Sequence, residues 1–348
     1  MVMIPLLHVL EHGGVLNASG VLSANYCTAW FLNIAAYCAV NTYGLISGYV
    51  GYEKKHGWTN FFMLLFQVSF YTILTTVFFA ILSPEKINLK IILAAIIPFA
   101  YGSYWYYTAY FCLFFVMPYL DIFIKKATRT ESRKMLISCF CVFSLLTTFF
   151  NRDIGNTVNG YSVLWLSILY LLGAYIKKYD IKVGGYAKAI LGYLVCVLIT
   201  WCSKLLIEFS TDVVFGVPKN GNYLIQYTSP TIVMCSVLLL LCFKELRFTQ
   251  GCKKAISFFA PAAFGVYLFH REPLIWDFID NAFAPFASYS TVGMLLATLI
   301  TALLIWLIGS LIDKMRIQLF FVLKIKQCCE NIDRRIINNK WIQLLENN

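Results

Sequence analysis

The chain has 348 residues, of which 60% are hydrophobic and only 13% are charged, against about 25% charged residues in an ordinary soluble domain. This composition excludes a soluble globular protein and indicates an integral membrane protein. The net charge of +11 falls in short basic clusters between apolar segments, a pattern typical of the loops that orient membrane proteins. We therefore expect these basic residues to lie at the surface of a lipid bilayer and not to bind nucleic acid.

Apolar segments succeed one another along the whole chain. About 20 helical residues cross a hydrocarbon core of about 30 Å, and only helices or closed barrels satisfy their backbone groups in lipid. The sequence therefore predicts an all-α polytopic membrane helical bundle with about ten transmembrane helices. The first run ends near residue 16, and the others cover residues 25–50, 58–82, 104–124, 135–150, 161–176, 186–207, 228–243, 256–275 and 289–312.

A shorter apolar piece, residues 87–100, contains Pro98 and is not expected to cross. Without it, the basic clusters all fall on one side, which the positive-inside rule identifies as cytoplasmic. Both termini are then cytoplasmic. We expect a transmembrane domain over residues 1–313 and a cytoplasmic amphipathic tail over residues 314–348, where apolar side chains alternate with Lys and Arg.

Three ionisable side chains stand in the first apolar run, namely His8, Glu11 and His12. Their spacing of i, i+3 and i+4 predicts one face of a helix, and ionisable groups inside a membrane indicate a functional site. Because an imidazole beside a carboxylate suits a general base, all three are candidate catalytic residues. The alternative is a set of polar groups that holds two helices together.

Residues 8–12 also spell the H-x-x-E-H motif, in which two histidines bind zinc and the glutamate activates water. A third ligand is not offered nearby, because the later acidic residues lie mainly in loops. The twelve cysteines are scattered through apolar segments without a C-x-x-C pair, as buried small hydrophobic residues are. We expect no metal site.

Two stretches in the first third of the chain carry candidate substrate-binding residues. Asn41, Ser47 and Tyr49 accompany small residues that let helix backbones approach closely, so packing is the alternative role of that stretch. Trp105 and Tyr110 belong to an aromatic run that fits either an interfacial belt or a row of substrate-stacking rings.

His270 and Arg271 are the last two candidates for substrate binding. They stand at the end of an apolar segment and precede Pro273, which bends or ends a helix. An interfacial helix terminus would explain the same residues.

Five motifs in order resemble the membrane-bound acyltransferase-3 family of bacteria, in particular the branch that decorates cell-surface polysaccharides. They are LLH at 6–8 with HGG at 12–14, LISGY at 45–49, FFVMPYL at 114–120, LYLLGAY at 169–175 and FGVYLFH at 264–270. The resemblance covers essentially the whole chain and implies a location in the bacterial plasma membrane.

This resemblance implies transfer of an acyl group, usually acetyl from cytosolic acetyl-CoA, to a hydroxyl of a cell-surface glycan or lipid-linked saccharide. Acetyl-CoA is then a substrate, and no bound cofactor is expected. The essential histidine of the family corresponds to His8, which Glu11 or His12 would orient, while His270 and Arg271 would stabilise the oxyanion or bind the glycan. The family usually carries an arginine eleven residues earlier, before the first residue here, so we expect the first helix to lack its start.

A transporter or flippase for a glycan or small polar substrate is the alternative class of function. A proton relay would use the same buried histidines. Release of free CoA thiol from acetyl-CoA distinguishes the two.

Overall fold

The computed structural model describes residues 1–54, 56–219 and 221–338. Every regular element within these residues is helical, so the predicted all-α bundle is confirmed. In the described part of the chain, six helical segments are long and apolar enough to cross a membrane, as expected of a multi-pass membrane protein. They are α3 with α4 (Ala24–Tyr37 and Ala39–Gly51), α5 (Trp58–Leu82), α7 (Trp105–Lys126), α8 with η2 and α9 (Arg129–Phe140, Cys141–Leu146 and Thr147–Phe149), α11 (Tyr186–Phe215) and α16 (Thr291–Val322).

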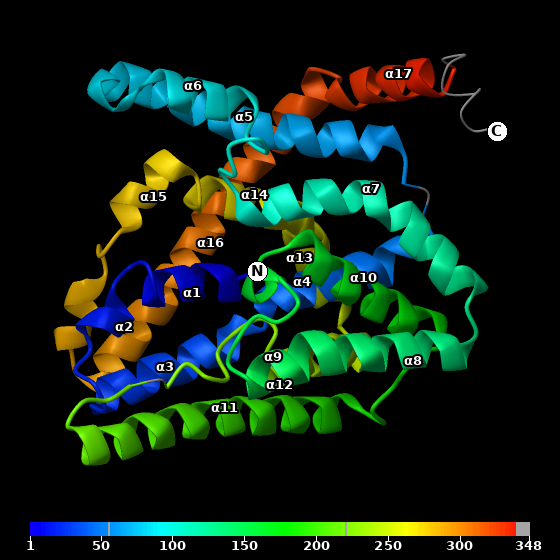
Figure 1. Ribbon diagram of the computed structural model, residues 1–348. Coiled ribbons are helices and arrows are strands. Elements are labelled where there is room, and N and C mark those ends of the chain that lie inside the picture. The colour runs from blue at the N-terminus through cyan, green and yellow to red at the C-terminus, as the bar shows by residue number, and fades with distance from the viewer. Residues whose placement is uncertain (55, 220, 339–348) are drawn as a thin grey trace.

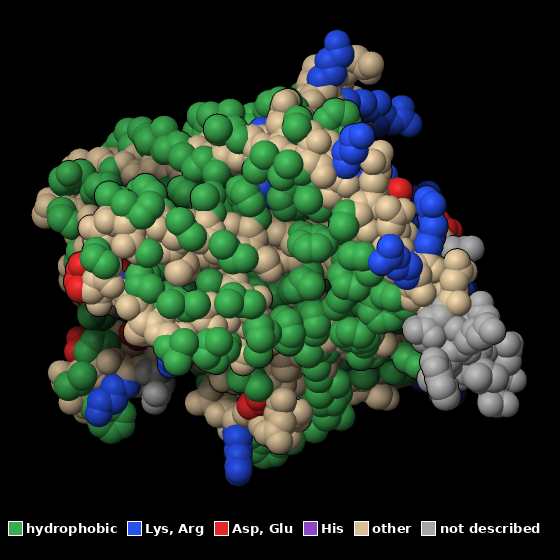
Figure 2. All heavy atoms as spheres, turned by 90° about the horizontal axis from the view of Figure 1, so that it is seen from above, with side chains coloured by type: hydrophobic (Ala, Val, Ile, Leu, Met, Phe, Trp, Pro, Cys, Tyr) green, Lys and Arg blue, Asp and Glu red, His purple; other side chains and the backbone are tan. Residues whose placement is uncertain are grey.

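The long helices form a bundle whose surface is mainly apolar. Figure 1 shows α7, α8 and α11 with their axes roughly parallel, with α6 and α17 at the top and α11 along the bottom. On the face shown in Figure 2, hydrophobic side chains predominate, and most Lys and Arg lie toward the right-hand side. This separation of apolar and basic surface is typical of a protein that spans a bilayer.

The other predicted spans are shorter or broken helices. α1 (Met3–Leu10) has 8 residues, and α10 (Val163–Lys178) and α12 (Pro230–Glu245) have 16 each, fewer than the ~20 that cross a bilayer without distortion. The predicted span 256–275 is interrupted near Pro261 and Pro273, because proline lacks the N–H that continues a helix. It forms parts of α13 (Gln250–Phe259), η4 (Ala260–Ala262), α14 (Ala263–His270) and α15 (Pro273–Ile279).

The remaining short elements connect these helices. Residues 87–100 form only α6, an eight-residue helix that packs on α5, where Thr72 Oγ1 donates to the Ala95 carbonyl oxygen (2.7 Å). This segment is too short to cross, as predicted. The short elements are α2 (Val15–Ala18), α6 (Leu89–Ile96), η1 (Pro84–Lys86), η3 (Val158–Gly160) and η5 (Ala284–Ser288).

Helix α11 continues to Phe215, eight residues beyond its predicted end at 207. The extension contains Glu208, whose carboxylate oxygen lies 2.6 Å from the buried Lys204 Nζ and accepts a hydrogen bond from the Tyr26 hydroxyl (2.9 Å). Because a buried charge is tolerated when it is paired and hydrogen-bonded, the helix does not end at its charged residues. The predicted apolar run ends at residue 207, directly before Glu208.

The predicted boundary between domain and tail at residue 313 falls within a helix. α16 continues to Val322, and the buried Asp313 accepts hydrogen bonds from Arg316 one turn later (2.8 Å). α17 (Ile325–Ile337) then packs on α5, where the Thr59 hydroxyl donates to Asp333 (2.8 Å). The last ten residues of the predicted tail, 339–348, lie outside the described residues.

Helices α4 and α10 approach each other closely. A Cβ on Gly48 would overlap the Tyr170 carbonyl, and a Cβ on Gly173 would overlap the Leu45 carbonyl oxygen. Glycine is therefore required on both helices for this approach. The contact holds α4 against α10, and α4 contributes to the cavity described below.

We expect Gly173→Ala to destabilise the protein by about 1–3 kcal/mol, the usual cost of inserting a methyl group into a packed core. Thermal unfolding of the purified protein measures the effect. Gly251→Ala is the matched control, because among the described residues nothing beyond the adjoining backbone of its own helix lies within 4 Å of the added Cβ. Equal melting temperatures for the two variants would contradict the close packing of α4 and α10.

Candidate active site

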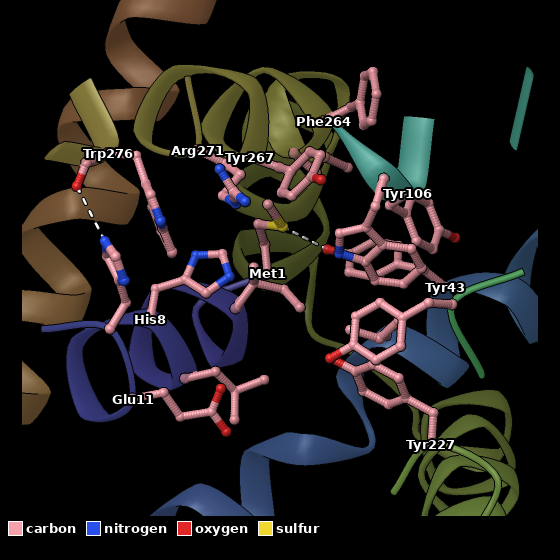
Figure 3. A pocket seen from close by; sticks show the side chains of 18 of the residues that line it. Met1, His8, Glu11, Tyr43, Tyr106, Tyr227, Phe264, Tyr267, Arg271 and Trp276 are labelled. Carbon is pink, nitrogen blue, oxygen red and sulfur yellow. Dashed lines mark hydrogen bonds between the residues drawn. The ribbon is translucent and has the colours of Figure 1, made fainter. Parts of the chain in front are cut away.

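A cavity of about 410 Å³ lies among α1, α4, α7 and α14, within the range of small-molecule sites. Four ionisable side chains face it, namely His8, Glu11, His12 and Arg271, and the rest of its wall is largely aromatic. Figure 3 shows that His8 and Arg271 point into the same space. The structure thus brings predicted residues from the start of the chain and from near residue 270 to one cavity.

Helix α1 ends sooner than predicted, at Leu10. The Gly13 N–H bonds to the His8 carbonyl oxygen (2.8 Å), and Gly14 adopts φ +88°, a left-handed conformation that favours glycine and ends helices. Glu11 and His12 therefore follow the helix instead of sharing one helical face with His8. All three nevertheless reach the cavity.

The turn after α1 is held by the segment that follows α15. The Asn281 N–H donates to the His12 carbonyl oxygen and the Phe283 N–H donates to the Gly13 carbonyl oxygen, both at 2.9 Å. A Cβ on Gly14 would lie 2.7 Å from Asn281 Oδ1. These contacts set the position of the histidine-bearing segment from a part of the chain almost 270 residues away.

A chain of hydrogen bonds assigns the tautomer of His8. His270 Nδ1 faces the Val266 carbonyl oxygen, which only accepts, so this nitrogen carries a proton. His270 Nε2 is then an acceptor in the neutral ring, and it lies 2.7 Å from His8 Nδ1, which donates to it. This arrangement leaves His8 Nε2 unprotonated and able to act as a base.

His270 itself does not line the cavity. It is 2% exposed and lies behind His8, with ring centroids 4.9 Å apart. Its hydrogen-bond contacts are with His8 and with the Val266 carbonyl oxygen. The sequence predicts a substrate-binding role for His270, and that role stays a prediction.

Trp276 organises the charged groups at one end of the cavity. Its indole stacks on His12 (4.0 Å between ring centroids) and meets the edge of His8 (4.7 Å). The Arg271 guanidinium lies 4.3 Å from the same ring, and no carboxylate among the described residues pairs with Arg271. Its charge is therefore available to an anionic group in the cavity.

Glu11 is placed by a neighbouring helix. The buried Asn33 on α3 donates from Nδ2 to Glu11 Oε1 (3.0 Å). The carboxylate keeps its other oxygen for the cavity, where it can accept a hydrogen bond from a hydroxyl group. Asn33 was not among the predicted residues, since the sequence does not show which way a single polar side chain in an apolar run points.

Of the seven predicted substrate-binding residues, Trp105 and Arg271 line the cavity, whereas His270 and four others lie outside its wall. Asn41 is fully buried; it donates to the Tyr227 carbonyl oxygen (2.7 Å) and accepts from Trp165 Nε1 (3.0 Å). It therefore supports the backbone of a residue in the wall. The other three contact side chains or backbone outside the four ionisable groups: Ser47 contacts Tyr43, Tyr49 contacts Lys177, and Tyr110 contacts Tyr106.

Ser47 and its neighbours illustrate this placement. The Ser47 hydroxyl donates to the Tyr43 carbonyl oxygen (2.9 Å), and Tyr110 packs on Tyr106 (6.3 Å between centroids). Tyr43 and Tyr106 line the cavity themselves. Both predicted residues are thus one layer behind the wall, and their roles in substrate binding stay predictions.

An aromatic wall faces the ionisable groups, and of its rings Trp105, Tyr161 and Tyr227 the sequence singled out Trp105 alone. Tyr161 and Tyr227 lie 5.0 Å apart, Trp105 lies 4.5 Å from Tyr161, and Tyr227 stacks on Tyr37 (4.7 Å). Tyr161 and Tyr227 come from loops and α7 contributes Trp105. With aromatic residues at 17% of the chain, no spacing rule distinguishes these rings from lipid-facing ones.

The zinc alternative gains no support from the geometry. Within residues 1–54, 56–219 and 221–338, no group of three His, Cys, Asp or Glu side chains could hold a metal ion. His8 uses Nδ1 to contact His270, and His12 Nε2 contacts the Trp276 carbonyl oxygen (3.3 Å). The residues present therefore fit a base in an organic-substrate site better than a metal centre.

The fold and the cavity define a multi-pass helical membrane protein with a base-bearing, aromatic-walled site. A family model described as an acyltransferase domain matches residues 1–310, so the chain belongs to the acyltransferase-3 family and is a membrane acyltransferase. No curated protein matches the chain. No solved structure matches it either.

Proposed function

We propose that this protein transfers an acetyl group from acetyl-CoA to a hydroxyl of a cell-surface glycan or lipid-linked saccharide in the bacterial plasma membrane. The observation that carries the proposal is the hydrogen-bond chain from the Val266 carbonyl through His270 to His8. It leaves a basic nitrogen at a cavity whose walls suit a sugar, since aromatic faces pack on its apolar surfaces.

The proposed reaction begins with the removal of a proton from the acceptor hydroxyl by His8 Nε2. The hydroxyl oxygen attacks the thioester carbonyl carbon, so a C–O bond forms and the carbonyl oxygen gains negative charge. When the C–S bond breaks, the thiolate takes the proton from His8 and leaves as free CoA. We propose that Arg271, which has no carboxylate partner among the described residues, stabilises the oxyanion.

Glu11 and His12 have supporting roles in this proposal. Glu11 accepts a hydrogen bond from the acceptor saccharide while Asn33 holds its other oxygen. His12 stacks on Trp276 and so fixes the ring against which Arg271 lies. No bound cofactor takes part in the proposed reaction.

The donor side follows from the distribution of charge. We propose that the basic end of the bundle, including Arg129, Arg133 and Lys134 on α8, faces the cytoplasm with both termini. Acetyl-CoA then approaches from that side and its thioester reaches His8 within the bundle. The acceptor enters from the opposite side.

The test is the release of free CoA thiol by the purified protein in detergent. We expect thiol release from acetyl-CoA only when a hydroxyl-bearing saccharide is present, with acetyl ester appearing on the saccharide. If saccharide moves across proteoliposomes while no thiol is released, the transporter alternative is correct and the proposal fails.

We expect Arg271→Gln to lower kcat by about 10²–10³, as the loss of one oxyanion donor does in other acyl transfers. Arg271→Lys keeps the charge but loses the planar fork, so its activity should fall between those of Arg271→Gln and the unaltered protein. Steady-state kinetics of CoA release measures both variants. Unchanged kcat in Arg271→Gln would remove Arg271 from the mechanism.

A further inference from the structure

A second cavity of about 290 Å³ lies among α8, α10 and α12, and no ionisable group of the candidate active site lines it. Its lining is apolar or aromatic except for Arg133. Trp165 and Leu169, both almost fully buried, close its floor, whereas Ile137 and Met234 at its rim are 55% and 42% exposed. The cavity is thus a groove that opens on the apolar surface of the bundle.

The groove exists because α8 packs loosely on the bundle. Only 17% of the membrane-spanning stretch of α8 and its continuation is buried. A π-helical segment, Cys141–Leu146, interrupts this stretch, and such segments occur frequently at functional sites. Leu136 and Phe140 line the groove from α8, opposite Leu172 on α10 and Val237 on α12.

Arg133 gives the groove a charged end. Its guanidinium has no carboxylate partner among the described residues, since no ion pair includes it. Arg129 lies one turn earlier on α8 and Lys134 is the next residue, so this end of the groove is basic. Basic clusters at the end of a membrane helix attract anionic lipid head groups.

The shape and charge therefore fit a molecule with an apolar tail and an anionic head. An apolar groove that faces the hydrocarbon is filled by lipid, because water finds no hydrogen-bond partners there. We propose that the groove holds one anionic phospholipid, with an acyl chain between α8 and α10 and its phosphate at Arg133. This inference does not depend on the proposed acyl transfer.

Native mass spectrometry of the whole purified protein tests the inference. The probes are dioleoyl phosphatidylglycerol and dioleoyl phosphatidylcholine, which share their acyl chains and differ in head-group charge. For the unaltered protein we expect one retained lipid, with phosphatidylglycerol preferred about fivefold, the effect of one well-placed basic residue. Equal retention of the two lipids would overturn the inference.

Two variants separate the head-group and chain contacts. Arg133→Gln should abolish the preference for phosphatidylglycerol while one lipid is still retained, and Leu136→Trp should fill the groove and remove the retained lipid. Lys134→Gln and Met135→Trp are the matched controls, because neither residue lines the groove. Lys134→Gln should keep most of the preference for phosphatidylglycerol, and Met135→Trp should keep the retained lipid. A preference that survives in Arg133→Gln, or a lipid retained in Leu136→Trp, would overturn the assignment.

Discussion

The variant His8→Ala should lose acyl transfer, with kcat lowered by at least about 10²–10⁴, the usual contribution of a general base. His8 faces the cavity, and its Nε2 is the basic atom left free by the hydrogen bond to His270. No other described histidine offers such an atom, since His12 contacts Trp276 and Asp280 instead. Release of CoA thiol and acetylation of a saccharide acceptor both measure the loss.

The amount of membrane-inserted protein should not change in His8→Ala, because α1 packs through its apolar residues Leu7, Val9 and Leu10, which are at most 3% exposed. His56→Gln is the matched control. His56 lies outside the cavity and contacts Asp121 (2.8 Å), a contact that glutamine can keep. Normal acetylation by His8→Ala would refute the assignment of the base.

The second large effect is expected for His270→Leu, with kcat lowered by about 10²–10⁴ and KM nearly unchanged. Leucine cannot accept the proton of His8 Nδ1, so the two tautomers of His8 become available and the basic nitrogen is no longer directed to the cavity. An orienting partner of a catalytic histidine has an effect of this size in serine proteases, about 10⁴. KM is preserved because His270 does not line the cavity.

His270→Gln distinguishes positioning from packing. A glutamine amide can accept from His8 Nδ1 through its oxygen and donate to the Val266 carbonyl through its nitrogen, so it reproduces both contacts of His270. We expect His270→Gln to retain a substantially larger kcat than His270→Leu at equal protein stability. If the two variants are equally active, His270 serves only to fill space.

Much of the fold could be predicted because membrane helices are read from length and apolarity alone. The ends of these helices were harder to predict. Paired charges extend α11 and α16 beyond their predicted ends, since Lys204 with Glu208 and Asp313 with Arg316 satisfy each other inside the bundle. A sequence shows each charge but not its partner's geometry.

The site was predicted in part for a related reason. His8, Glu11 and His12 were identifiable because ionisable groups are rare inside a membrane, and Arg271 stood out in the same way. Aromatic residues are common throughout the chain, so Tyr161 and Tyr227 carried no such signal, although the aromatic run that contains Trp105 did stand out.

The sequence alone thus determined that the chain is an all-α membrane protein, that it resembles acyltransferases, and that its first apolar run carries candidate catalytic groups. Only the tertiary structure decided which groups meet. His8 and His270 are 262 residues apart in the chain, and His8 Nδ1 lies 2.7 Å from His270 Nε2. Which of these two nitrogens donates depends on the contact of His270 Nδ1 with the Val266 carbonyl oxygen. A hydrogen bond depends on the relative position and orientation of both rings, and these are set by how α1 and α14 pack.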